Sequence, residues 1–178
     1  IYKTPRLYRV ELDGESGLGG GGGRVTRLTD GYGSMARFTP DGSGLVFQRG
    51  YSPLDRPVYR GSGNYDLWKL TFGDGAGSFT RLTFDPANDF DGGPLADGWG
   101  VFVSSRDGQN NVYRMRAGGE SGGAPVPLTN FKPTDGQKTI GHGVRDLAVS
   151  ADGRMAVFVV WDRLYRLDLS DANARPME

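Results

Sequence analysis

Three short sequence patterns recur in the same order along this chain of 178 residues, and this repetition limits the possible folds more than any other feature. The first is an aromatic residue between an aliphatic and a basic one, the second is Leu-Thr, and the third is Asp-Gly followed by Val-Phe. The aromatic pattern stands at 7–9, 67–69, 112–114 and 164–166, the Leu-Thr pairs begin at Leu28, Leu82 and Leu128, and the Asp-Gly pairs begin at Asp41, Asp97 and Asp152. A constant order with Asp-Gly spacings of 56 and 55 residues indicates one structural unit repeated with loops of variable length.

Each repeat is expected to consist of β-strands. The chain contains 30 glycines and 10 prolines, and these residues interrupt nearly every window long enough for a helix. Asp-Gly between two apolar segments is a strong hairpin signal, because glycine accepts a positive φ angle without a Cβ clash. The longest stretch without Gly or Pro, 154–175, has β-branched residues followed by period-2 alternation, which predicts two strands around a tight turn at 161–163.

Four antiparallel strands in a repeat of about 50 residues are typical of a β-propeller blade. The fold class that we predict is therefore all-β, a partial β-propeller with two whole blades and two partial ones. In order from the innermost strand outward, the expected strands are 34–39, 45–49, 65–71 and 79–83 in one blade; near Leu95, 101–104, 112–116 and 125–129 in the next; 147–150, 155–160 and 164–169 in the third; and the two outer strands 7–12 and 24–29 of an earlier blade. The predicted divisions are blade ends near 1–30, a blade at 31–84, a blade at 85–130 and a partial blade at 131–178.

Composition excludes several classes of protein. The 21 basic residues balance the 21 acidic ones, so net charge does not favour nucleic acid or an anionic membrane as partner. The absence of cysteine excludes disulfides, thiolate metal sites and thiol nucleophiles. The longest apolar run, 155–161, is far shorter than the roughly 20 residues that cross a bilayer. Because the chain begins with Ile1, we expect it to be a piece of a longer protein that supplies the remaining blades.

Two loops are unusually long for their places in the repeats, 50–64 and 130–143, and blade geometry puts both on the same face of the propeller. Long loops on a rigid scaffold often carry binding residues, and the alternative, which we favour, is that they are insertions that the surface tolerates. The candidate binding residues on this face are Tyr59, Arg60, Arg106, Asp107, Lys132 and His142. An arginine fork formed by Arg60 or Arg106 would suit a peptide carboxylate, and the alternative is simple pairing of these arginines with nearby aspartates.

No catalytic residue, metal site or cofactor is predicted. His142 is the only histidine, no second histidine exists for a zinc site, and no serine stands in a nucleophile-elbow context. Asp85, Asp89 and Asp91 lack the spacing of a calcium loop, so we interpret this stretch as a solvated loop between blades. The five glycines at 19–23 are followed by no lysine and no helix, which indicates a flexible linker and not a phosphate loop.

The repeats resemble the PD-type propeller repeats of the TolB and Tricorn families. The residues that carry this resemblance are "FTPDG" and "VSADG" in the hairpins, "VFVSSRDG" leading into "NVYRM", and the segment 59–68, "YRGSGNYDLW", which is similar to the "YRGG...DIW" element of Tricorn-type proteases. Ser62 stands where that element has its second glycine. The resemblance covers essentially the whole chain and implies the second half of a six-bladed ring.

This resemblance implies a non-catalytic propeller segment of a large cytoplasmic serine peptidase, which gates or channels peptides toward a separate catalytic region and supports assembly. Its partners would be peptides, other domains of the same chain or further copies in a homo-oligomer. None of the catalytic residues of the family falls on this chain. Two alternatives remain: a TolB-like protein-binding propeller, for which the location would be periplasmic, and the cap propeller of a prolyl-oligopeptidase-type hydrolase.

Overall fold

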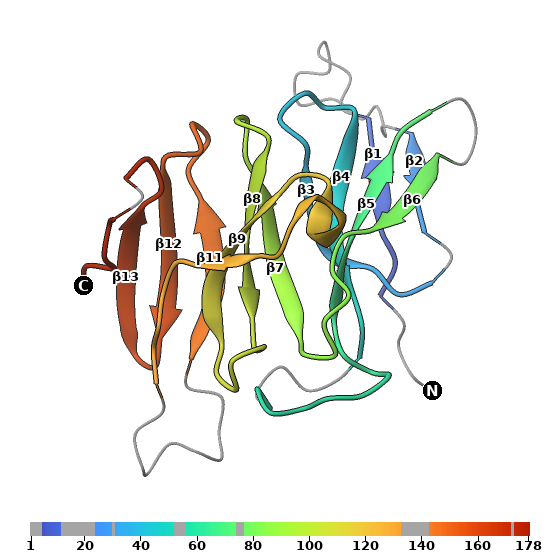
Figure 1. Cartoon of the computed structure of the whole chain (residues 1–178). Coiled ribbons are helices and arrows are strands. Elements are labelled where there is room, and N and C mark those ends of the chain that lie inside the picture. The colour runs from blue at the N-terminus through green and yellow to red at the C-terminus, as the bar shows by residue number, and fades with distance from the viewer. Residues whose placement is uncertain are drawn as a thin grey trace.

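The computed structural model describes residues 5–11, 24–29, 31–51, 56–73, 77–132, 143–171 and 173–178, and these form an all-β structure with one short 3-10 helix (Figure 1). The strands are β1 (Tyr8–Val10), β2 (Val25–Arg27), β3 (Ser34–Phe38), β4 (Gly44–Arg49), β5 (Asp66–Thr71), β6 (Ser78–Arg81), β7 (Asp89–Pro94), β8 (Trp99–Ser104), β9 (Asn111–Arg116), β10 (Val126–Pro127), β11 (Val144–Val149), β12 (Met155–Val160) and β13 (Arg163–Asp168). The 3-10 helix η1 (Gly119–Gly122) lies between β9 and β10.

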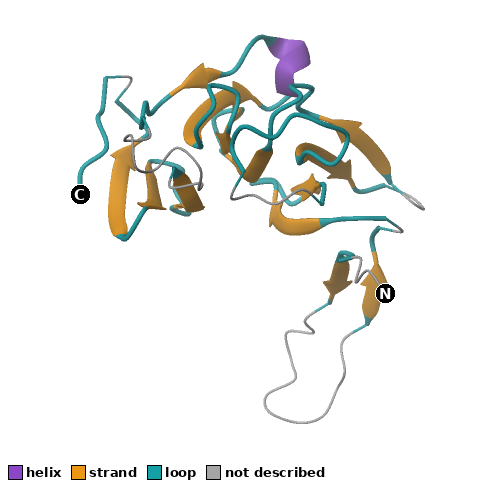
Figure 2. Cartoon of the chain, turned by 90° about the horizontal axis from the view of Figure 1, so that it is seen from below, coloured by secondary structure: helices purple, strands orange, loops and turns teal. Residues whose placement is uncertain are grey.

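The strands form four antiparallel sheets, which we number in chain order. Sheet I is β1-β2, sheet II is β3-β4-β5-β6, sheet III is β7-β8-β9-β10, and sheet IV is β11-β12-β13. Within sheets II to IV, neighbours in sequence are neighbours in space, as in a propeller blade. The sheets follow one another along an arc and do not close into a ring (Figure 2).

The predicted fold class, a partial β-propeller, is confirmed, and most strands begin and end within a few residues of their expected limits. The largest difference is the innermost strand of sheet III, which we expected only near Leu95. This strand, β7, begins at Asp89, so Asp89 and Asp91 belong to a strand and not to a solvated loop. Asp89 is fully buried. The polar composition of this stretch indicated a solvated loop, but its carboxylates have partners inside the protein, so the stretch can form a buried strand.

The hydrophobic clusters lie between sheets. In β8, Phe102 packs with Val46 and Leu67 of sheet II, whereas Val101 and Val103 pack with the buried side chains of sheet IV. Successive side chains of a strand point to opposite faces, so a strand covered on both faces is apolar at every position. The same rule explains β4, where Val46 faces sheet III and its two neighbours in sequence face sheet I.

The Asp-Gly pairs form the turns between the first and second strands of sheets II, III and IV, as predicted. Gly42, Gly98 and Gly153 have φ angles of 69°, 79° and 72°. In the first turn, the Thr39 hydroxyl and the Ser43 side chain and N–H all donate hydrogen bonds to Asp41. These bonds lower the pKa of Asp41 to about 2, so its carboxylate stays charged at neutral pH.

Replacing Gly98 by alanine is expected to destabilise the chain by about 1 kcal/mol, because a Cβ is strained at positive φ. A Cβ built there would meet no atom within 4 Å, so the cost would come from the backbone conformation alone. Gly118→Ala is the matched control, since Gly118 is equally open but has a φ of −76°. Urea unfolding of both variants measures the difference, and equal stabilities would contradict this account of the turn.

Candidate functional site

Arg106 is the centre of a charged cluster at one end of sheet III. Its Nη2 lies 3.2 Å from Asp89 Oδ1 and 2.8 Å from Glu120 Oε1, and its Nε donates to the Ser104 hydroxyl at 2.8 Å. The three partners come from β7, η1 and the end of β8. The short connection after β8 therefore fixes the guanidinium between two carboxylates.

Burial dominates the electrostatics of this cluster. It raises the pKa of Asp89 to about 6, although Arg106 and the Ser104 hydroxyl lower it, and Glu120 adds a smaller upward shift. Burial also disfavours the charge on Arg106, but the two carboxylates outweigh this effect and its pKa is raised. The guanidinium of Arg106 is thus the shared counter-charge of two carboxylates in a poorly solvated environment. Of these three groups, Asp89 is the one whose charged form is least favoured.

Arg60 reaches the same end of sheet III from the segment between β4 and β5. Its Nη2 donates to the carbonyl oxygens of Ser105 at 2.9 Å and Arg106 at 3.2 Å, and its Nη1 donates to those of Pro57 and Tyr59. The Tyr59 hydroxyl accepts a hydrogen bond from the N–H of Gly63. Arg60 therefore closes its own loop and fastens it to the turn that begins with Ser105.

The structure brings four of the candidate binding residues together: Tyr59, Arg60, Arg106 and Asp107. Asp107 accepts a hydrogen bond from the Tyr113 hydroxyl, and burial, together with this bond, raises the pKa of Tyr113. Lys132 is exposed at the beginning of the second long loop. His142, most of that loop and the glycines at 19–23 lie outside the described residues. Ligand binding at these positions stays a prediction, since the bonds above are all intramolecular.

The innermost strands share a feature that the sequence analysis missed. Each of β3, β7 and β11 has a register shift against its neighbour. At the shifts, Met35, Asp91 and Asp146 have φ angles of 51°, 51° and 55°, which is unusual for residues other than glycine. Such bulges redirect side chains. The sequence does contain a signal for these bulges: each of the three residues stands six positions before the aspartate of its Asp-Gly turn.

Asp91 of β7 interacts with residues of sheets II and IV. Its N–H donates to Gln48 Oε1 of β4 at 3.0 Å, and its carboxylate lies close enough to the backbone N–H groups of Leu147 and Asp146 in β11 for them to lower its pKa. Burial raises the pKa of Asp91, the nearby Asp146 carboxylate raises it further, and Arg37 of β3 lowers it. Arg37, Asp91 and Asp146 are therefore close neighbours on the inner side of the arc.

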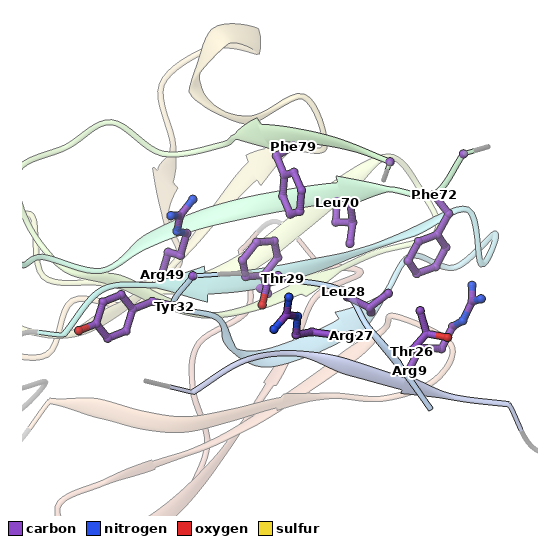
Figure 3. Close-up of a pocket in the computed structure, with 14 residues that line it drawn as sticks. Arg9, Thr26, Arg27, Leu28, Thr29, Tyr32, Arg49, Leu70, Phe72 and Phe79 are labelled. Atoms are coloured by element: carbon purple, nitrogen blue, oxygen red, sulfur yellow. The ribbon is translucent and has the colours of Figure 1, made fainter. Parts of the chain in front are cut away.

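A cavity of about 530 Å³ lies between sheets I and II. Figure 3 shows side chains of β1 and β2, among them Arg27, facing those of the strands of sheet II, among them Phe79. The sequence analysis did not predict this cavity, because it depends on how far apart two neighbouring sheets stand. Within the described ranges, no three His, Cys, Asp or Glu side chains gather as they would to hold a metal ion, and no helix is long and apolar enough to cross a membrane.

Four-stranded antiparallel blades, radial stacking and bulged inner strands define this chain as a segment of a β-propeller. Its fold is that of the propellers of TolB and of tricorn protease, which confirms the resemblance stated from the repeats. No protein-family model matches the chain, and no curated protein does.

Several solved structures are similar in fold. A TolB-type protein from Agrobacterium tumefaciens matches 87% of this chain with a TM-score of 0.64 and 21% identity, and the match spans 52% of that protein. Tricorn protease matches 86% with a TM-score of 0.63 and 18% identity, over 14% of its own chain. A puromycin-hydrolyzing peptidase from Mycobacterium tuberculosis matches 86% with a TM-score of 0.59 and 16% identity, over 23% of its chain. This chain therefore spans about half the length of the TolB-type protein and less of the two peptidases.

Arg106→Gln is expected to destabilise the protein by about 3 kcal/mol, because it leaves the Asp89 carboxylate buried without a counter-charge. Arg114→Gln is the matched control: Arg114 also pairs with an aspartate, Asp97, and stacks on an aromatic ring, but its partner is half exposed. This surface pair should contribute about 1 kcal/mol or less. Urea unfolding at pH 7 compares them, and equal losses would show that the Arg106 cluster is not effectively buried.

Asp89 should also give the protein a pH-dependent stability. Its folded pKa of about 6 lies above the value of 3.8 expected for a solvated carboxyl, so the folded state binds the extra proton in between. The free energy of unfolding of the wild type relative to Asp89→Asn should therefore fall as the pH rises from 4 to 7, by up to about 3 kcal/mol. Urea titrations across this range measure the trend. A difference between the wild type and Asp89→Asn that stays constant across this range would contradict it.

Proposed function

We propose that this chain is a non-catalytic propeller segment of a tricorn-like serine peptidase, which gates or channels peptides toward a catalytic region elsewhere in the parent protein and supports its assembly. The observation that carries the proposal is the inner surface of the arc, where β3, β7 and β11 lie side by side. Arg37 and Asp146 are exposed there on either side of Asp91. A surface with both signs of charge offers complementary partners to acidic and to basic side chains of a passing peptide.

Because this surface is rigidly supported, we expect it to act as a fixed opening and not as a lid that moves. Asp91 of β7 interacts with β4 of sheet II and with β11 of sheet IV, and the Arg106 cluster fixes the turns at one end of sheet III. An opening built in this way selects by size and charge. The peptides, the partner domains of the same chain and a cytoplasmic location belong to this proposal.

The similarity to TolB-type proteins favours a second candidate, a protein-binding propeller without a peptidase, for which a periplasmic location is proposed. The cap propeller of a prolyl-oligopeptidase-type hydrolase is a third, favoured by the similarity to a puromycin-hydrolyzing peptidase. All three use the same scaffold and differ in what the propeller is attached to.

The test uses the native protein, captured from its source with an antibody against this chain, then weighed by mass spectrometry and treated with a serine-hydrolase probe. A mass several-fold above 19.2 kDa together with labelling is the expected result. A mass of about twice 19.2 kDa without labelling would replace the peptidase proposal by the TolB-like one.

Gating makes a further prediction for the full-length peptidase. Arg37→Glu should change kcat/KM for long charged peptides by about threefold to tenfold, lowering it for acidic and raising it for basic ones, because it reverses a charge on the proposed path. Dipeptide-sized substrates should be unaffected. Arg154→Glu, an exposed arginine in the turn before β12, is the control, and an equal effect of both variants would exclude a specific path along the inner strands.

A further inference from the structure

The cavity between sheets I and II has the size and the walls of a small-molecule site. Its volume of about 530 Å³ falls in the usual range for such sites. One part of its lining is apolar and comes from both sheets: Leu28, Phe47, Leu70, Phe72 and Phe79. In Figure 3, Leu70, Phe72 and Phe79 extend from the strands of sheet II toward the side chains of sheet I.

The charged part of the lining is entirely basic among the described residues. Arg9 of β1, Arg27 of β2 and Arg49 of β4 line the cavity, and none of the other described lining residues carries a carboxylate. Arg9 is already paired with Glu11 and Arg27 also interacts within the chain, so among the described lining residues the positive charge left for a ligand is that of Arg49. A cavity with apolar walls and positive charge favours an anion that carries an apolar group.

Arg49 is the arginine best placed to hold this anion. Its guanidinium stacks on the Trp68 ring at 5.0 Å, and the described residues offer it no hydrogen bond or ion pair. Arg9 differs, since its Nη2 is already paired with Glu11 at 3.0 Å. Gly31 keeps the space beside Arg49 open, because a Cβ at this position would come within 3.1 Å of Arg49 Nη2.

A carboxylate matches these features. The planar guanidinium fork donates two parallel hydrogen bonds to the two oxygens of a carboxylate. The Trp68 ring under the guanidinium holds it in place without using its hydrogen-bond donors. We therefore propose that the cavity between sheets I and II binds a small apolar carboxylate, with Arg49 holding the carboxylate and Phe47 and Phe79, whose ring centroids lie 6.2 Å apart, in contact with the apolar group. The ligand is a free carboxylic acid or the last residue of a peptide, which share this chemistry.

Calorimetric titration of the full chain with 3-phenylpropanoate tests the proposal. The acid should bind, its affinity should decrease as salt is added, and the uncharged 3-phenylpropanamide should bind at least tenfold more weakly. Equal binding of the acid and the amide, or no binding of either at millimolar concentration, would overturn the proposal. This comparison needs no variant, so it does not depend on how a substitution affects folding.

Variants then assign the site. Arg49→Gln should weaken acid binding about tenfold or more, because it removes a charge-assisted pair of hydrogen bonds, and Arg49→Lys should lie between it and the wild type. Arg154→Gln, which alters an exposed arginine in the turn before β12 and outside the cavity lining, should stay within twofold of the wild type. Unchanged circular dichroism spectra confirm that each variant is folded. Equal affinities for Arg49→Gln and Arg154→Gln would show that the acid binds elsewhere.

A last comparison identifies the source of the carboxylate. A pentapeptide ending in phenylalanine is titrated in its free-acid and amidated forms. Binding of the free-acid form alone supports the end of a peptide as ligand, and binding of 3-phenylpropanoate without either peptide supports a free acid. Equal binding of both peptide forms would contradict recognition of a carboxylate. The site does not depend on the gating proposal, because its ligand and its place between sheets are separate from the inner surface of the arc.

Discussion

Burial of each sheet by its neighbours is the interaction on which the rest of this structure depends. The hydrophobic clusters of the described residues are shared between sheets I and II, II and III, or III and IV. Each blade-like repeat leaves its hydrophobic faces exposed unless a neighbouring repeat stacks on them, so each sheet is stable only in the row. Strand β8 is an example: Phe102 belongs to the cluster shared with sheet II, and its two neighbours in sequence belong to the cluster shared with sheet IV.

Polar contacts add order to this apolar stacking. The Arg106 cluster ties η1 and β7 to the end of β8, and Arg60 brings a loop of sheet II to the same place. At the inner side of the arc, Asp91 connects β4 with β11 across β7. These buried bonds are sensitive to geometry because an unpaired charge there is costly. They fix the separation and angle of sheets that hydrophobic contact alone would allow to slide.

The two proposed functional surfaces follow from the same construction. Radial stacking of sheets produces an inner surface made of first strands, where Arg37 and Asp146 are exposed. It also leaves a space wherever neighbouring sheets diverge, and sheets I and II diverge by enough to form the cavity beside Arg49. A propeller thus offers one site along its axis and others between its blades. The chemistry at either place is set by a few side chains and not by the fold.

The sequence by itself determined the blades. The Asp-Gly turns require positive φ at Gly42, Gly98 and Gly153, and the alternation within 155–168 specifies β12 and β13, so local chemistry was enough to place most strands and to predict a propeller. It could not determine the partners of charged residues. Arg106 could equally have been a ligand-binding fork, and Asp89 and Asp91 had the composition of a loop. Only the tertiary structure decided that Arg106 and Asp89 are buried together, that Asp91 reaches the next sheet, and that Arg49 faces a cavity. These outcomes depend on contacts between residues far apart in the chain, such as the 43 positions that separate Gln48 from Asp91, and burial changes the cost of a charge in a way that no local pattern encodes.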